Sequence, residues 1–133
     1  MHVMTINSEA LFQALSDNTR LRIVRLLATT SQEICLCELV DALLEPQYKL
    51  SRHLKVLRQA GLLTSQKEGR WVYHRLVEAP DYLQQLYAMV RSLPDSNEIY
   101  STDLSQFNDR MKLREEGRCR VGVLSDDLKV EVK

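Results

Sequence analysis

Residues 46–77 read PQYKLSRHLKVLRQAGLLTSQKEGRWVYHRLV and carry the strongest structural signal in this chain. Leu50, Leu54 and Leu57 recur at helical spacing, and they lie within about 60° of one another on a helix of about 100° per residue. Such a cluster predicts one buried edge on a helix over residues 47–60. The polar and basic residues of this segment then occupy the opposite, exposed face.

Proline and glycine residues set the limits of this helix. Pro46 suits its first turn, where the missing amide hydrogen of proline costs nothing, and Gly61 suits its C-terminal cap. Two β-type runs follow, at residues 62–65 and 71–77. The glycine-containing connection between them, residues 66–70, predicts a β-hairpin.

Helical periodicity also marks most of the remaining chain. We expect further helices over residues 8–16, from Asp17 or Asn18 to about residue 28, over 34–44, over 81–93 and over 103–116. Two helices joined by a tight turn and followed by a hairpin are the outline of a winged helix-turn-helix. The predicted fold class is therefore mainly α, with about five or six helices and a β-hairpin wing. We expect residues 1–95 to form this domain, and 96–133 to form an extension that ends in a mobile tail from residue 118.

The composition excludes several classes of protein. A chain of 133 residues fits one domain, and 44% hydrophobic with 27% charged residues is typical of a folded soluble protein. No apolar run approaches the roughly 20 residues that a membrane-spanning helix needs, so no membrane partner is expected. The first residues lack the pattern of a secretory signal, and an odd number of cysteines (three) favours a reducing compartment. We therefore expect a cytoplasmic protein.

The charges are unevenly placed, although the formal net charge is zero. Residues 1–45 carry a net charge of −3, residues 46–75 carry +6, and residues 76–133 carry −3. The positive block coincides with the predicted amphipathic helix and hairpin. Such a concentration is typical of a surface that binds nucleic-acid phosphates.

An exposed basic helix fits the DNA major groove, where residues near its N-terminus reach the base edges. The expected contacts are Gln47, Tyr48, Lys49, Ser51 and Arg52 to bases, Lys55 and Arg58 to phosphates, and Lys67 and Arg70 at the hairpin tip to the backbone or the adjacent minor groove. His53 is a further candidate for base contact, and packing against the preceding helix is an equally plausible role for it. Tyr48 could instead pack at the rim of the core.

Three blocks of sequence resemble the ArsR/SmtB family of bacterial winged-helix repressors. They are LSDNTRLRI at residues 15–23, LSRHLKVLRQAGLL at residues 50–63 and EGRWVYHRL at residues 68–76. The resemblance implies a homodimer that binds a two-fold symmetric operator in double-stranded DNA and releases it on binding metal or metalloid. It also implies that terminal helices form the dimer interface, which here would be helix 81–93 together with helix 8–16.

The segment EICLCEL at residues 33–39 resembles the arsenic-sensing motif of that family. By this resemblance the thiolates of Cys35 and Cys37 bind As(III) or Sb(III), and soft sulfur ligands suit such thiophilic ions. As(III) is expected to take three sulfurs, but Val40 stands where close relatives have the third cysteine. Three outcomes are open for Cys119. It completes the site within the subunit, it completes the site across the dimer, or it takes no part while a small thiol supplies the third sulfur.

The Cys-x-Cys spacing predicts a mechanism, on the expectation that both residues lie on one helix. Residues i and i+2 are about 200° apart on an α-helix, so both would grip one small ion only if the first turn of helix 34–44 unwinds. This helix leads into the basic helix, so we expect the distortion to lower DNA affinity. By linkage, DNA should weaken metalloid binding by the same factor.

Two other signals are alternatives for such a repressor. One is oxidation of Cys35 and Cys37, or of either with Cys119, to a disulfide. The other is a thiophilic divalent metal; divalent-metal sensors of the family use His with Asp or Glu on the last helix, and residues 81–93 contain Asp81 but no His.

The sequence has no glycine-rich phosphate loop and no nucleophile with a plausible base, so we expect neither an enzyme nor a catalytic cofactor.

Overall fold

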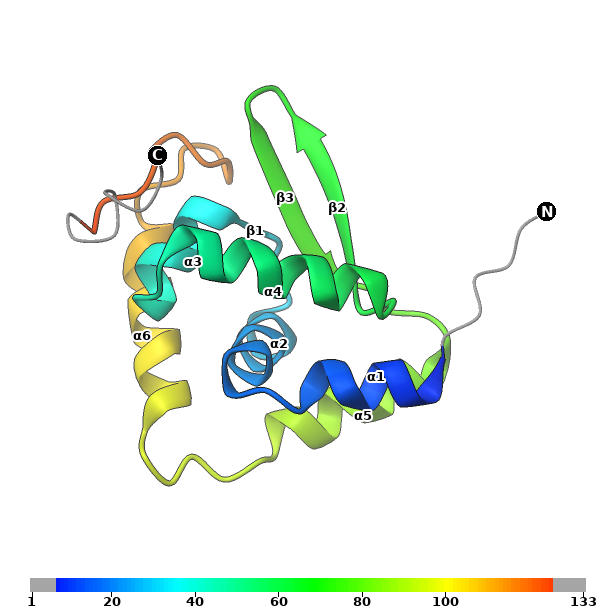
Figure 1. Cartoon of the computed structure of the whole chain (residues 1–133). Coiled ribbons are helices and arrows are strands. Elements are labelled where there is room, and N and C mark those ends of the chain that lie inside the picture. Colours follow the sequence, from blue (N-terminus) through cyan, green and yellow to red (C-terminus); the bar gives the residue numbers. More distant parts are fainter. Residues whose placement is uncertain (1–6, 126–133) are drawn as a thin grey trace.

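The computed structural model describes residues 7–125, which form six α-helices and three β-strands (Figure 1). In chain order they are α1 (Ser8–Leu15), α2 (Asn18–Thr30), β1 (Ile34–Cys35), α3 (Leu36–Leu43), α4 (Gln47–Gln59), β2 (Leu63–Glu68), β3 (Trp71–Leu76), α5 (Asp81–Arg91) and α6 (Ile99–Met111). This arrangement confirms the predicted winged helix-turn-helix. Within residues 7–125, no helix has the length and apolar character needed to cross a membrane.

The core beneath the helix-turn-helix is built on the predicted buried edge of α4. Leu50, Leu54 and Leu57 are at most 1% exposed and pack with apolar residues of α2 and α3. Between α3 and α4, Leu44 adopts the left-handed conformation, with φ 55°. That conformation ends α3 and turns the chain into α4.

Capping residues explain where two of the helices begin. The Asp17 carboxylate accepts a 3.0 Å hydrogen bond from the Arg20 amide, which confirms the expected N-cap of α2. The Asp95 carboxylate likewise accepts hydrogen bonds of 2.9 Å from the amides of Tyr100 and Ser101. Because of this cap, α6 runs from 99 to 111. It begins four residues and ends five residues before the helix expected at 103–116.

The wing belongs to a three-stranded antiparallel sheet of order β1-β3-β2. The last residue pair between β2 and β3 is Glu68 with Trp71. The connection therefore has only two residues, 69 and 70, instead of the expected 66–70. Gly69 in this turn has φ 63°, which glycine adopts without strain. The pairing of Cys35 with Tyr73 makes the start of the segment expected as helix 34–44 a short strand.

The C-terminal part packs against the domain. Phe107 of α6 is 1% exposed within the main core, and α6 lies against α2 and α3. The prediction of a mobile tail from residue 118 is wrong for residues 118–125, which lie beside α3 (Figure 1) and are held by hydrogen bonds to Asp41 and Arg110. The remainder of that prediction, residues 126–133, lies outside the described residues.

Candidate functional site

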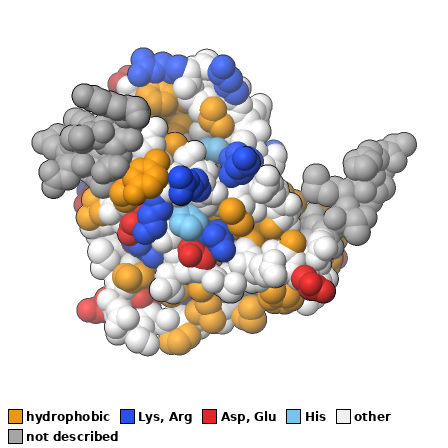
Figure 2. All heavy atoms as spheres, viewed as in Figure 1, with side chains coloured by type: hydrophobic (Ala, Val, Ile, Leu, Met, Phe, Trp, Pro, Cys, Tyr) orange, Lys and Arg blue, Asp and Glu red, His pale blue; other side chains and the backbone are white. Residues whose placement is uncertain are grey.

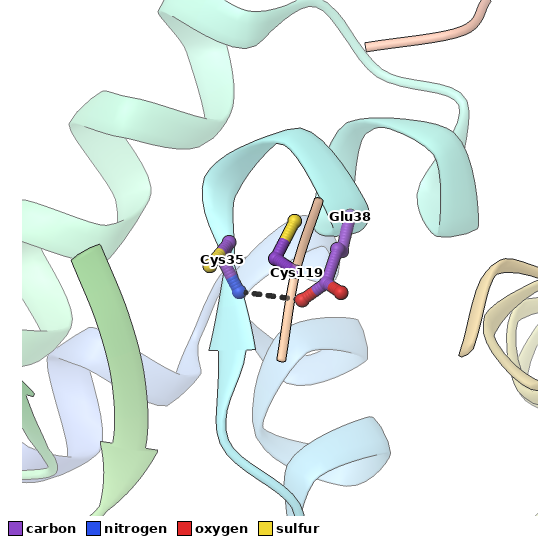
Figure 3. A group of neighbouring side chains, drawn as sticks. All are labelled: Cys35, Glu38 and Cys119. Atoms are coloured by element: carbon purple, nitrogen blue, oxygen red, sulfur yellow. Dashed lines mark hydrogen bonds between the residues drawn. The ribbon is translucent and has the colours of Figure 1, made fainter. Parts of the chain in front are cut away.

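The three cysteines meet where β1 passes into α3. Cys35 is the last residue of β1 and the N-cap of α3, Cys37 lies in the first turn, and Cys119 comes from the C-terminal segment. The Sγ atoms of Cys37 and Cys119 are 3.6 Å apart, and those of Cys35 and Cys119 are within 4.8 Å (Figure 3). With metal–sulfur bonds of about 2.3 Å in a tetrahedron, as at zinc, two sulfurs on one ion lie about 3.8 Å apart. These thiols are therefore close enough to share one ion after a small adjustment.

Cys35 and Cys37 do not lie on one regular helix. The Cys35 backbone is extended, with φ −84° and ψ 155°. The prediction that the first turn of a helix must unwind is therefore wrong, because Cys35 precedes the helix and the sulfurs of both residues already lie near that of Cys119, within 4.8 Å for Cys35 and at 3.6 Å for Cys37.

The three thiols differ in protonation. Hydrogen bonds from Cys35 and Cys119 lower the pKa of Cys37 to about 7, against the effect of burial. The pKa of Cys35 is raised, because this thiol donates to Cys37 and is buried. Burial and the nearby Glu38 charge raise the pKa of Cys119 to about 11. Near neutral pH the half-buried Cys37 is therefore the nucleophilic thiolate of the group.

Three arginines hold the C-terminal segment against residues 33–41, and we call them the arginine ladder (Arg110, Arg114 and Arg118). Their partners run in the opposite chain direction: Arg110 pairs with Asp41 at 2.7 Å, Arg114 with Glu38 at 2.8 Å, and Arg118 with Glu33. Sequence reasoning missed these residues. The available signal was arginine at every fourth position after Phe107, in a chain with acidic residues around the Cys-x-Cys motif.

The same segment touches the wing. The amide of Cys119 donates a 2.9 Å hydrogen bond to the Tyr73 hydroxyl in β3. The neighbouring Arg118 lies 4.6 Å above the Tyr73 ring and 3.4 Å from the carboxylate of Glu68, at the end of β2. The backbone of Cys119 is therefore hydrogen-bonded to β3, and the preceding residue, Arg118, pairs with the end of β2.

The predicted DNA-contacting residues form one basic surface over α4 and the wing tip (Figure 2). Its exposed members are Tyr48, Ser51, Arg52, Lys55, Arg58, Lys67 and Arg70. Gln47 and Lys49 are half-buried, and the Lys49 ammonium lies 2.8 Å from the Glu45 carboxylate. Arg52 lies 5.9 Å from the centre of the exposed Tyr48 ring, so Tyr48 is placed outside the core.

His53 is turned toward α2. Its Nδ1 lies 3.2 Å from a guanidinium nitrogen of Arg20 and 3.8 Å from the Asp17 carboxylate. Partial burial lowers the pKa of His53 despite the neighbouring Asp17. Of its two predicted roles, this placement favours packing against the preceding helix over contact with a base.

Comparison with known proteins agrees with this architecture. A family model described as "Bacterial regulatory protein, arsR family" matches residues 17–65, from the α2 cap into β2. The arsenic resistance transcriptional regulator ArsR1 of Pseudomonas putida is 44% identical over 87 residues, which are 65% of this chain and 66% of the relative. The arsenical resistance operon repressor of Escherichia coli is 52% identical over 66 residues, 50% of this chain and 56% of the relative.

A third relative is matched over most of its length. An HTH-type transcriptional regulator of Methanocaldococcus jannaschii is 36% identical over 83 residues, 62% of this chain and 90% of the relative. The family-model match, residues 17–65, includes the complete helix-turn-helix. This chain belongs to the arsR family of bacterial regulatory proteins.

Proposed function

We propose that this protein is a transcriptional repressor that releases its operator when Cys35, Cys37 and Cys119 bind As(III) or Sb(III). The observation that carries the proposal is the meeting of three thiols within one chain, where the amide of Cys119 is hydrogen-bonded to the wing of a DNA-binding fold. Two of the similar proteins are named for arsenic or arsenical resistance, which supports a metalloid as the signal.

The donor set suits a trivalent metalloid. Arsenious acid, As(OH)₃, would exchange its three hydroxyl groups for three sulfurs, and each hydroxyl would leave as water, with a proton from the thiol or, at the Cys37 thiolate, from solvent. Cys37 would attack first, because it is the thiolate near neutral pH. Cys35 and Cys119 would then complete the set. Of the outcomes open for Cys119, the 3.6 Å distance to Cys37 favours completion of the site within the subunit.

Two connections would carry the signal to DNA. Cys35 and Cys119 are both bonded to Tyr73, the first through strand pairing and the second through its amide. Drawing their sulfurs toward one ion would therefore pull on β3 and tilt the wing. Cys37 lies in α3, which leads into α4. Linkage requires that bound DNA weaken metalloid binding by the same factor.

DNA would be bound through the basic surface. The N-terminal part of α4 would enter the major groove, and Lys67 and Arg70 would lie against the backbone or the minor groove. We further propose a homodimer on a two-fold symmetric operator. Exposed apolar residues on α1 and α5 (Phe12, Tyr82 and Met89) support an interface there, and Figure 2 shows apolar side chains along this edge of the molecule.

The test measures release of a labelled DNA duplex that the protein has selected from a random library. Arsenite under reducing conditions should release the wild type. Cys119→Ser should bind DNA as well as the wild type and need about 10- to 100-fold more arsenite for release. Arg52→Ala should weaken DNA binding and leave arsenite binding unchanged. Release of Cys119→Ser at the wild-type concentration would remove Cys119 from the site.

A second candidate signal is an oxidant, which the 3.6 Å separation of Cys37 and Cys119 also favours. Hydrogen peroxide would oxidise Cys37 to a sulfenic acid and release water; attack by Cys119 would then form the disulfide and a second water. Peroxide added without arsenite distinguishes the two candidates, because only a redox-responsive repressor would release DNA under those conditions.

A further inference from the structure

We infer that Arg114 sets the metal selectivity of the thiol site by keeping the carboxylate of Glu38 out of the ligand set. This inference rests on the proposed metalloid site and identifies what that site would reject. It concerns a fourth potential donor beside the three thiols, the carboxylate of Glu38.

Glu38 places an oxygen beside the sulfurs. Its side chain is fully buried, and a carboxylate oxygen lies within 4.8 Å of the Sγ atoms of Cys35 and Cys119 (Figure 3). With Cys37, these residues amount to three sulfurs and one oxygen. Zn²⁺ takes four ligands in a tetrahedron and accepts both thiolate and carboxylate, so the four donors together match such a divalent ion.

The Glu38 carboxylate, however, already has other partners. Arg114 donates from Nε to Oε2 and from Nη2 to Oε1, both at 2.8 Å, and the Cys35 amide donates to Oε1 at 2.9 Å. Arg114 is itself held by the Glu33 carbonyl at 2.8 Å and is only 8% exposed. Turning the carboxylate toward an ion would leave a buried guanidinium without its counter-charge, which is strongly unfavourable.

The consequence differs between trivalent and divalent ions. As(III) is satisfied by three sulfurs and a lone pair, and three thiolates neutralise its charge. A divalent ion on the same sulfurs would lack a fourth protein ligand. Sequestration of Glu38 thus favours the metalloid without any direct contact between Arg114 and the ion.

The experiment titrates the full chain with Cd²⁺, followed by thiolate-to-cadmium absorption, and separately with arsenite. In Arg114→Gln, Cd²⁺ affinity should rise by about 10- to 100-fold, a range typical of changes around a metal site, while arsenite affinity changes little. Adding Glu38→Gln to that variant should remove the gain, because no carboxylate is then available. Arg114→Lys keeps the charge but not the paired hydrogen bonds, and should give a smaller gain.

Each other outcome counts against the inference. Unchanged Cd²⁺ affinity in a variant that still binds arsenite would show that Glu38 is not withheld by Arg114. A gain that survives Glu38→Gln would show that another group is the fourth ligand. Loss of arsenite binding in both Arg114 variants would mean that Arg114 only positions Cys119. Failure of the wild type to bind arsenite would instead contradict the proposed function.

Discussion

His74 illustrates how burial sets the behaviour of a single residue in the wing. It lies in β3, is 5% exposed, and its Nδ1 is 2.7 Å from the Ser65 hydroxyl. Burial, together with the positive charge of Arg58, lowers its pKa to about 4. The sheet that joins the thiol site to the wing therefore contains a neutral imidazole at physiological pH.

We predict that protonation of His74 destabilises the fold at low pH. Its folded pKa of about 4 lies below the ordinary value of 6.5, so the unfolded chain binds the extra proton between these two pH values. The free energy of unfolding has its full value above pH 6.5. It falls by about 2 to 3 kcal/mol as the pH is lowered toward 4. Urea unfolding across this range measures it, with His74→Asn as the non-titrating control. Equal pH slopes for both proteins would contradict the prediction.

The candidate site was predictable only where a residue belongs to a motif. Cys35 and Cys37 stand in a recognisable sequence, but nothing in the sequence near Cys119 indicates which neighbours it has. Its amide bonds to Tyr73 and its thiol lies against Cys37, and these residues are 46 and 82 positions away in the chain. The four-residue spacing of the arginine ladder is visible in the sequence, but it does not show which acidic residues pair with these arginines.

At the scale of elements, the C-terminal segment connects the thiol site with the wing. Arg118 bridges Glu33, just before β1, and Glu68, at the end of β2. This bridge spans the outer edges of the same sheet whose central strand carries Tyr73. A shift of Cys119 therefore reaches the wing through a side chain as well as through the backbone.

We predict that Arg118→Gln weakens coupling between ligand and DNA without removing either activity. Arsenite affinity and the operator affinity of the free protein should stay within about threefold of wild type, while the coupling free energy should fall by about 0.5 to 2 kcal/mol. Operator titrations with and without saturating arsenite measure this change. Lys112→Gln serves as the control, because Lys112 is exposed and, within residues 7–125, its ion pair is with nearby Asp109. Full coupling in Arg118→Gln would rule out the bridge.

Elements with strong periodicity were predictable, whereas elements set by tertiary contacts were not. The leucines of α4 and the Asp17 cap of α2 were identified because their signals are local. β1 has only two residues and forms because β3 offers it an edge, which no local pattern reveals. The start of α6 was misplaced because Asp95, which caps it from four residues before Ile99, stands in a stretch that looks like a polar loop.

At the scale of the whole molecule, an apolar surface on α5 has no partner among the described residues. Tyr82 and Met89 are seven positions apart and so share one helix face, and they are 46% and 50% exposed. Phe12 on α1 is 59% exposed. This pattern is typical of a helical surface that is covered by a second copy.

We predict that Met89→Asp separates the protomers. A charged carboxylate in an apolar interface costs about 2 kcal/mol or more, and both copies would carry one. Sedimentation velocity should show a monomer, operator affinity should fall, and arsenite should still bind at one equivalent per chain. Ala88→Asp, an exposed position on a different face of α5, is the matched control. A dimeric Met89→Asp protein would place the interface elsewhere.

The enclosure of all three thiols within one chain has a consequence for the shape of the response. Dimer assembly depends on the amount of protein, whereas filling of an intramolecular site depends on free ligand alone. The two protomers of a dimer would then fill one after the other. In a half-filled dimer one wing would be displaced and the other would keep its DNA-binding position. Such a dimer would bind a symmetric operator through a single half-site. Derepression would accordingly begin with a partial step before full release.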